Sequence, residues 1–345
     1  MDALYGRGCG ERLGNPTGYL NGVLMRRQLT IACGDYDRTH ALVDGSVHPE
    51  GLCLNWLDLP HLEIWTRMRN CYDFDASEIS LASFTIAKTM GKPLVGIPVF
   101  PGRAFRHSYI FVNANSGIRE PQDLMGKRVG LGEFQQPATV WVRGILQHEY
   151  GVSLEKIRWC TWTQQSRMEM ELARQYQVQK IPAGAKPDEL LIKGELDAVI
   201  LTSHFASFAR GTPNVRRLFE NYQEVEAAYF KKTSIFPIMH AVAMREDLWR
   251  EHPWIATSLY KAFQKSKQMA YERLNDLSPY KLSMVWFREP MAQQREVLGE
   301  DPWCDGVERN RHTLETLIGY LCEQEMITKK PAVDDLFAPN TLTLT

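Results

Sequence analysis

The chain has 345 residues, a hydrophobic content of 44% and a formal net charge of −1. This length allows two domains, and the near-neutral charge excludes an electrostatic case for binding nucleic acid or an anionic membrane surface. Because no apolar run approaches the ~18–20 residues that cross a bilayer, a membrane-spanning helix is excluded as well.

The first 28 residues are rich in glycine and contain no continuous apolar stretch. A secretory signal requires such a stretch, about 7–15 residues long. We therefore interpret residues 1–28 as a flexible leader, with translation starting at Met1 or at Met25. The protein is expected to be cytoplasmic.

After the leader, short apolar runs alternate with helical patterns. The first run, 29–33, stops at the polar turn 34–39, which is typical of a strand that delivers polar groups to a sheet edge. Strands that alternate with helices indicate parallel α/β units. We expect strands at 29–33, 51–57, 73–80, 93–100, 109–113, 127–131, 157–160, 197–201 and 234–244, and helices at 61–70, 81–90, 136–150, 188–193, 253–277 and 309–325.

The sequence contains none of the common local motifs for binding a cofactor or a metal. The seven cysteines are scattered without a C-x-x-C pair, so they are expected to be small buried side chains in a reducing compartment. No P-loop, G-x-G-x-x-G or G-x-S-x-G motif is present, and the HEYG segment at 148–151 lacks the second histidine of a zinc-protease helix. We predict no cofactor and no metal ligand, although distant Asp, Glu and His residues leave a divalent metal open.

The segment 116–130, SGIREPQDLMGKRVG, resembles the opening of the second lobe in type II periplasmic binding proteins. The resemblance implies a two-lobed α/β fold with a central ligand cleft. Its lobes are joined by crossing strands, expected near 107–113 and 236–242. The implied parts are a leader of residues 1–28, a discontinuous first lobe of 29–108 plus 241–338, and a second lobe of 109–240.

Nearly the whole chain after the leader resembles the 4,5-dihydroxyphthalate decarboxylase family. The FRHS and IFPIMH segments are specific to this family, whereas D-L-x-G-K-R-V marks the fold alone. GEFQ at 132–135 replaces a PEYQ-like segment, and a histidine stands in the loop 200–205. These departures leave the exact hydroxyaromatic substrate open. The matching stretches are LTIACGDYDR (29–38), DFDASEISLAS (73–83), IPVFPGRAFRHSYIFVN (97–113), ATVWVRGILQHEYGV (138–152) and IFPIMH (235–240), with later matches at PW (253–254), DPW (301–303) and LFAP (336–339).

The resemblance implies a cofactor-independent carboxy-lyase that acts on a hydroxylated, catechol-type aromatic acid. Loss of CO₂ from such a ring needs a proton at the carbon that bears the carboxylate. A ring hydroxyl ortho or para to that carbon supplies the electrons, so no cofactor is needed. The protein must bind one or two carboxylates, polarise a phenol and place a general acid over the ring.

The segment 103–108 is the richest candidate for this chemistry. Arg103 and Arg106 offer planar forks suited to a carboxylate, and Ser108 is expected beside them as a substrate ligand. His107 is expected to handle protons because histidine titrates near neutral pH. The alternative is a solvated hinge whose charges pair with nearby acids.

Further candidates stand at the ends of predicted strands, where ligands bind in open α/β sheets. Asp35 and Glu78 are predicted as catalytic, and Arg38 and Ser80 as substrate ligands. Asp35 could accept a phenolic proton or orient a histidine, but it could equally cap its own turn.

Three more residues complete the predicted site. His240, on the second crossing strand, is expected opposite His107 as a proton-handling group; the alternative is a satisfied core histidine. Thr139, near the start of a predicted helix, could present hydroxyl and N–H groups to an anion. His204 is the weakest of the predicted substrate ligands.

The fold does not by itself decide the function. Rival readings are a solute-binding protein for a small anion, a cytoplasmic sensor, or another biosynthetic enzyme on the same fold. The expected partner is a small aromatic carboxylate, with no nucleic acid and no membrane, and we expect a homo-oligomer.

Overall fold

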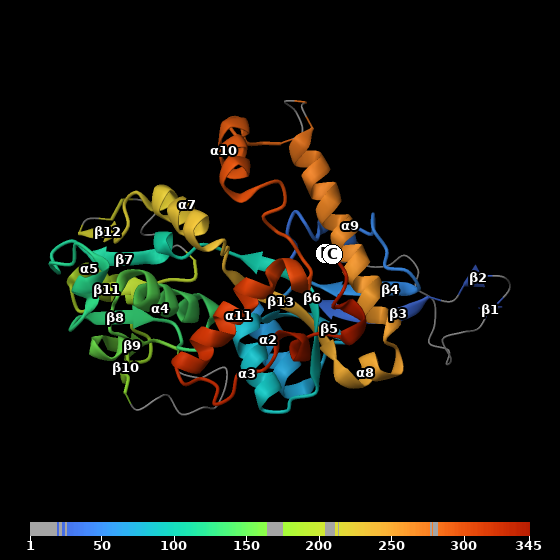
Figure 1. The fold of residues 1–345 in the computed structure, drawn as a ribbon, viewed down its shortest axis with the longest axis horizontal. Coiled ribbons are helices and arrows are strands. Elements are labelled where there is room, and N and C mark those ends of the chain that lie inside the picture. Colours follow the sequence, from blue (N-terminus) through green and yellow to red (C-terminus); the bar gives the residue numbers. More distant parts are fainter. Residues whose placement is uncertain are drawn as a thin grey trace.

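Two mixed β-sheets lie side by side along the long axis of the molecule (Figure 1). The α/β class that the sequence predicts is therefore confirmed. The computed structural model describes residues 19–20, 23–24, 26–163, 175–203, 211–212, 214–276, 278 and 282–345.

The first sheet has the strand order β4-β3-β5-β13-β6. β3 runs parallel to β4 and β5, whereas β13 is antiparallel to β5 and β6. Every residue of β5 is buried, including its serines and its glutamate. This sheet therefore holds polar side chains at its centre, where they need partners. Its strands are β3 (Arg27–Ala32), β4 (Leu52–Leu57), β5 (Ala76–Ser80), β6 (Leu94–Arg103) and β13 (Ile238–Arg245).

The second sheet has the order β10-β9-β8-β11-β7-β12. The four strands from β10 to β11 are parallel, and β7 runs antiparallel to both of its neighbours. All of these strands come from one continuous part of the chain. They are β7 (Ile110–Asn113), β8 (Arg128–Leu131), β9 (Arg158–Thr161), β10 (Gln177–Lys180), β11 (Ala198–Ile200) and β12 (Val215–Arg217).

Helix α4 is buried from Pro137 to Leu146 and packs against α3, α11 and β13. Because it follows β8, it ties the second sheet to the first. A short ribbon of β1 (Tyr19–Leu20) and β2 (Val23–Leu24) precedes β3. The helices are α1 (His40–Val43), α2 (His61–Cys71), α3 (Leu81–Thr89), α4 (Pro137–Tyr150), α5 (Pro187–Lys193), α7 (Tyr222–Thr233), α8 (Glu246–Glu251), α9 (Trp254–Asn275), α10 (Arg288–Leu298) and α11 (Val307–Glu323).

Two chain segments cross side by side between the sheets. Arg103, the last residue of β6, is paired with Ile238, and the backbone N–H of Ala104 donates to the carbonyl of Pro237 at 3.1 Å. The first crossing thus lies a few residues before the 107–113 segment expected for it. It brings the ends of β6 and β13 to the boundary between the two sheets.

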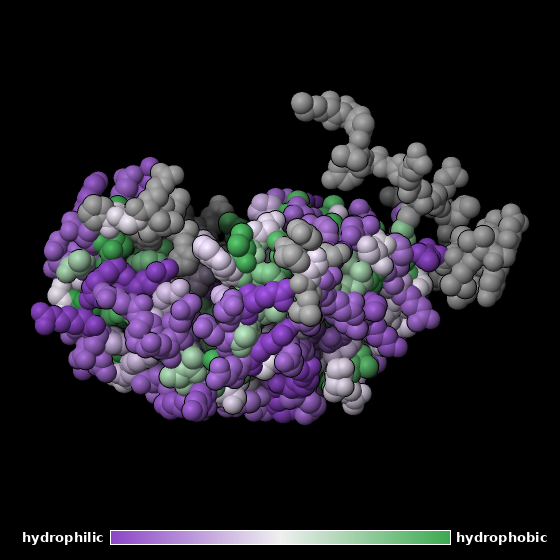
Figure 2. All heavy atoms as spheres, turned by 90° about the horizontal axis from the view of Figure 1, so that it is seen from above, coloured by the Kyte–Doolittle hydropathy of each residue, from purple (hydrophilic) through white to green (hydrophobic). Residues whose placement is uncertain are grey.

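Among the described residues, no helix is long and apolar enough to cross a membrane. Figure 2 shows hydrophilic side chains over most of one face, with apolar side chains in small groups.

Cys53 is disulfide-bonded, which departs from the expectation that the cysteines are reduced. Free thiols are Cys33, Cys71, Cys160, Cys304 and Cys322.

Candidate active site

A pocket of about 480 Å³ lies where the two crossing segments meet the start of α4. The turn after β3 and the loop that carries Trp303 close its other sides. Two histidines and three arginines line it, so it combines groups that handle protons with groups that bind anions. The lining residues are Tyr36, Arg38, His61, Gly102, Arg103, Ala104, Arg106, Gln136, Pro137, Ala138, Thr202, Ser203, Met239, His240 and Trp303.

Glu78, on β5, is the centre of a hydrogen-bond network below this pocket. Its Oε1 lies 2.6 Å from Nδ1 of His240 and accepts from the Tyr36 hydroxyl at 2.9 Å. Its Oε2 accepts from the backbone N–H of Gly34 at 3.1 Å and from the Cys33 thiol at 3.3 Å. A carboxylate only accepts hydrogen bonds, so Nδ1 of His240 carries a proton in this pair.

The network keeps Glu78 ionised. Burial by itself would raise its pKa, but the hydrogen bond from His240 and the charges of His240 and His61 outweigh burial and lower the pKa to about 2. Burial and the neighbouring Glu78 charge raise the pKa values of Tyr36 and Cys33, so both remain protonated donors. The result is a fixed negative charge that orients one histidine ring.

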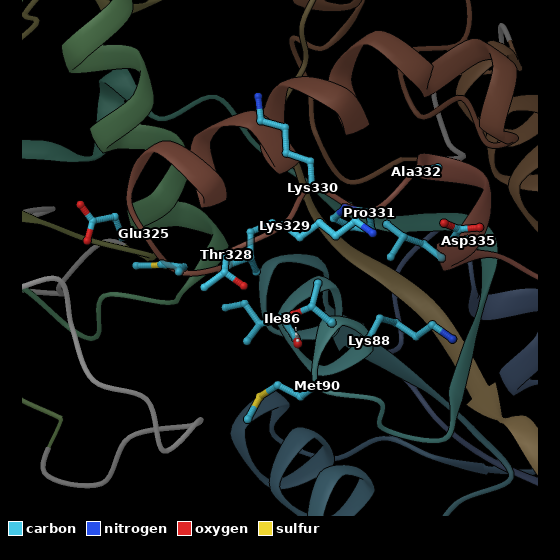
Figure 3. Close-up of a pocket in the computed structure, with 14 residues that line it drawn as sticks. Ile86, Lys88, Met90, Glu325, Thr328, Lys329, Lys330, Pro331, Ala332 and Asp335 are labelled. Carbon is cyan, nitrogen blue, oxygen red and sulfur yellow. Dashed lines mark hydrogen bonds between the residues drawn. The ribbon is translucent and has the colours of Figure 1, made fainter.

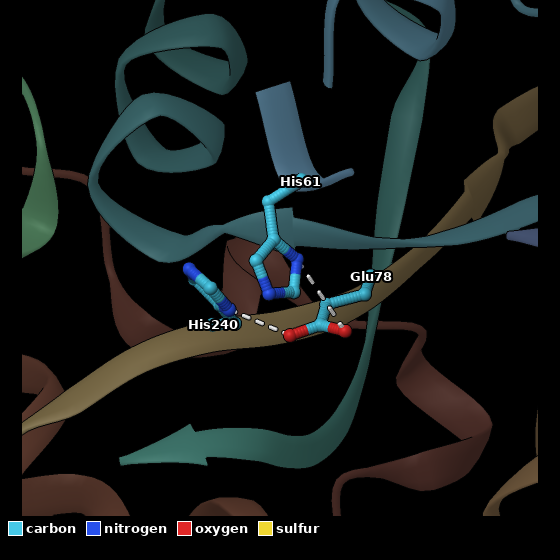
Figure 4. A group of neighbouring side chains, drawn as sticks. All are labelled: His61, Glu78 and His240. Carbon is cyan, nitrogen blue, oxygen red and sulfur yellow. Dashed lines mark hydrogen bonds and ion pairs between the residues drawn. The ribbon is translucent and has the colours of Figure 1, made fainter. Parts of the chain in front are cut away.

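His61, the first residue of α2, adds a second histidine to the group. Its Nε2 lies 3.1 Å from the Tyr36 hydroxyl, its Nδ1 lies 3.9 Å from Oε2 of Glu78, and its ring centroid is 4.8 Å from that of His240. Figure 4 shows both rings beside the Glu78 carboxylate. His61, Glu78 and His240 each offer one ligand atom within 4.8 Å of the others, so they could hold a metal ion.

Arg106 is buried at the pocket without a carboxylate partner in the described part of the chain. Its Nη1 donates weakly to the Thr202 carbonyl at 3.4 Å, and its guanidinium carbon lies 5.0 Å from the Tyr109 ring centroid. Nε has no hydrogen-bond partner among the residues that the structure describes. Burial lowers its pKa to about 10, only partly offset by Tyr109 and Glu226, so it stays charged at neutral pH. A buried cation of this kind favours an anionic ligand.

The two other arginines of the pocket have partners in the protein. Arg38 is sandwiched between the rings of Tyr36 and Trp303, with its guanidinium carbon 4.4 and 3.8 Å from the two centroids, and Nε donates to the Pro101 carbonyl at 2.9 Å. Arg38 therefore holds the Trp303 ring in place as one wall of the pocket.

Arg103 lines the pocket too, but it ties the 304–310 segment to the crossing. It donates to the carbonyls of Phe236 and Cys304 at 3.1 and 2.6 Å and also to the side chain of Asn310. Burial lowers the pKa of Arg103. Most of the N–H groups of Arg103 are therefore used in hydrogen bonds within the protein.

His107 does not face the pocket, contrary to the expected position. Its side chain is 1% exposed and lies among the rings of Tyr150, Phe219 and Tyr229, with centroids 6.0, 5.1 and 5.3 Å away. Neither ring nitrogen has a hydrogen-bond partner among the described residues, and burial lowers its pKa to about 4. The neighbouring Ser108 is also buried, where its N–H donates to Glu226 at 2.9 Å.

The remaining predicted residues have local structural contacts. Asp35 pairs with His40 at 3.0 Å on the surface. The Ser80 hydroxyl accepts from the N–H of Ser83 at the start of α3. The Thr139 hydroxyl donates to backbone carbonyls at the start of α4. These three are absent from the pocket lining, and His204 lies outside the described residues.

The structure thus brings together Arg38, Arg103, Arg106 and His240 at the pocket, with Glu78 directly below. The sequence interpretation missed Tyr36, His61 and Trp303 as pocket residues. Tyr36 and Trp303 could have been found, because they stand in the LTIACGDYDR and DPW stretches that carried the resemblance.

A larger pocket, about 800 Å³, lies between α3 and the segment 325–336 (Figure 3). Its polar lining consists mainly of lysine, glutamate, aspartate and threonine side chains, without histidine. It therefore lacks a group that titrates near neutral pH and is a weaker candidate for acid–base chemistry.

Comparison with known proteins agrees with the fold and identifies the family. No family model matches the chain. The periplasmic sulfonate-binding proteins SsuA of Methylobacillus flagellatus and Escherichia coli superpose with TM-scores of 0.58 and 0.55 at 16% and 13% identity, covering 92% of this chain and 93% and 99% of theirs. The desulfurization enzyme DSZB has a TM-score of 0.51 at 13% identity, over 92% of this chain and 98% of its own. These likenesses establish the periplasmic-binding-protein fold.

Two curated relatives are much more similar in sequence. The 4,5-dihydroxyphthalate decarboxylase of Comamonas testosteroni is 35% identical over 92% of this chain and 98% of its own length. The enzyme of the same name from Pseudomonas putida is 33% identical over 61% of this chain and 84% of its own. Because the first similarity spans both chains almost completely, this protein belongs to the 4,5-dihydroxyphthalate decarboxylase family.

Proposed function

We propose that this protein is a carboxy-lyase that removes CO₂ from a hydroxylated phthalate of the catechol type, without a metal or an organic cofactor. Membership of the decarboxylase family supports the reaction class. The observation that carries the proposal is the His240–Glu78 pair: Nδ1 is bound to Glu78, and Figure 4 shows the other ring nitrogen directed away from that carboxylate. His240 lines the pocket and can present Nε2 to a substrate.

The reaction needs one proton for each CO₂ released. A ring hydroxyl para to the reacting carbon donates electron density into the ring, and that carbon takes a proton from Nε2 of His240. The C–C bond to the carboxylate then breaks, its electron pair restores the aromatic ring, and CO₂ departs. Glu78 holds the His240 ring and stabilises its protonated form, as a carboxylate does in other acid–base pairs.

Arg106 is the proposed anchor for the carboxylate that remains on the ring. A guanidinium bound to the departing carboxylate would stabilise its negative charge and oppose formation of neutral CO₂. The retained carboxylate has no such conflict, and a dicarboxylate offers both groups at once. Arg106 has no carboxylate partner among the described residues and lines the same pocket as His240, which favours a phthalate over a simple benzoate.

The test is turnover of 4,5-dihydroxyphthalate by protein stripped with EDTA. Expected products are CO₂ and 3,4-dihydroxybenzoate, and in D₂O the vacated ring carbon should carry deuterium. His240→Gln should lose turnover, whereas His312→Gln, an exposed histidine on α11, serves as the matched control. Binding without CO₂ release would favour the solute-binding alternative, and activity that returns only with added metal would overturn the cofactor-free part.

A further inference from the structure

His61, Glu78 and His240 form a compact group of potential metal ligands that the proposed reaction uses only in part. They come from the start of α2, the centre of β5 and the facing strand β13, so elements distant in sequence converge at one point (Figure 4). Their ligand atoms all lie within 4.8 Å of one another.

The donor set indicates which ions would bind. Two imidazole nitrogens with one carboxylate oxygen suit Zn²⁺, Cu²⁺ or Ni²⁺, whereas Mg²⁺ and Ca²⁺ prefer oxygen ligands alone. Bonds of about 2.0–2.2 Å place tetrahedral ligand atoms roughly 3.3–3.5 Å apart. Nδ1 of His240 lies 2.6 Å from Oε1 of Glu78, and Nδ1 of His61 lies 3.9 Å from Oε2 of the same carboxylate. With one ligand atom taken from each residue, the three atoms lie within 4.8 Å of one another. Separations would have to change by at most about 1.5 Å to reach the tetrahedral spacing, which side-chain rotation can supply.

The groups that surround these three residues resemble the hydrogen-bond partners that hold metal ligands in place. If Nδ1 of His61 faces an ion, its Nε2 keeps the Tyr36 hydroxyl at 3.1 Å, which is the second contact that metal-bound histidines commonly make. The backbone N–H of Gly34 donates to Oε2 of Glu78 at 3.1 Å and so holds the carboxylate in place. The His61 side chain is 49% exposed at the pocket, which supplies an entry path and an open coordination position.

We propose that His61, Glu78 and His240 bind one divalent transition-metal ion and that this ion inhibits decarboxylation. The inhibitory part depends on the proposed function. An ion on Nδ1 of His240 displaces the proton shared with Glu78, and its positive charge cancels the carboxylate charge that stabilises the protonated ring. His240 then cannot act as the proton donor.

Zinc binding is tested by calorimetry on EDTA-stripped protein, with Co²⁺ absorption bands as an independent readout of the ligand set. We expect one ion per chain and at least tenfold weaker binding in His61→Gln. The side chain of His61 is about half exposed, so this substitution should not prevent folding. Glu78→Gln should have the same effect if it folds. The matched control is His40→Gln, because exposed His40 also sits between carboxylates, at 3.0 Å from Asp35 and 3.8 Å from Asp44. Equal zinc affinity in wild type and His61→Gln would overturn the site.

Activity is measured separately, so the two proposals fail independently. Zn²⁺ should lower kcat for 4,5-dihydroxyphthalate at stoichiometric occupancy, and EDTA should restore it. A protein that binds zinc but never releases CO₂ would retain the metal site and refute the proposed function. Zinc that binds and raises kcat would overturn the inhibition.

Discussion

Replacing His107 by phenylalanine should remove a pH-dependent part of the stability. The His107 ring is buried among three aromatic rings, and its pKa falls from 6.5 to about 4 because burial disfavours the charged form. Between these values the unfolded chain binds a proton that the folded protein does not, so stability is full above about pH 6.5 and falls as the pH approaches 4. A shift of about 2.5 units at ~1.4 kcal/mol per unit amounts to roughly 3 kcal/mol.

At pH 4.5 about 2.5 kcal/mol of this contribution is lost. Urea unfolding of wild type and His107→Phe at pH 7.5 and 4.5 gives the difference directly, because all other titrating groups are common to both proteins. The wild type should lose ~2–3 kcal/mol more than the variant on acidification. Since His107 is absent from the pocket lining, kcat at pH 7.5 should stay within a few-fold. Parallel stability curves, or a hundredfold loss of kcat, would refute the structural role.

Other changes address the pocket and its support. Arg106→Gln should raise KM for the dicarboxylate by an amount equivalent to ~2–5 kcal/mol. The folding stability should not fall, because the substitution removes a buried charge that has no carboxylate partner among the described residues. Steady-state kinetics and urea unfolding measure the two effects. His240→Gln should lower kcat ~10²–10⁴-fold with little change in substrate affinity, and near wild-type turnover would contradict the proton-transfer role. Lys267→Met should destabilise the protein by ~3–5 kcal/mol, because it leaves Asp305, now 3.1 Å from Nζ, buried without its cation; an unchanged urea midpoint would contradict this.

Much of the fold could be predicted because apolar runs and helical patterns reflect burial. The expected helix at 136–150 is α4, one residue shorter at its start, and the expected strand at 51–57 is β4. The helix α10 was missed because its sequence, REPMAQQREVL, is mostly polar, and none of its residues is buried. The edge strand β10 was missed for a similar reason, since its residues are largely exposed.

Site residues could be predicted where their position on a strand places them at the pocket. They could not be predicted where only tertiary contacts bring them there. His240 and Glu78 were both selected from strand positions, and the pairing of β13 with β5 brings them together. His107 was expected on a crossing strand, but it begins the short 3₁₀ helix η1 (His107–Tyr109), which turns the ring into an aromatic cluster. Nothing local to the start of α2 indicates that His61 reaches Glu78.

The position of β13 has a consequence for how the chain folds during synthesis. β13 lies between β5 and β6, yet it follows every strand of the second sheet along the chain. While the polypeptide emerges from the ribosome, β5 and β6 must therefore wait unpaired at this edge until β13 has been made. The second sheet needs no later strand and can assemble first. Glu78 gains its hydrogen bond to His240 only when β13 inserts, so the pocket cannot be complete before that step.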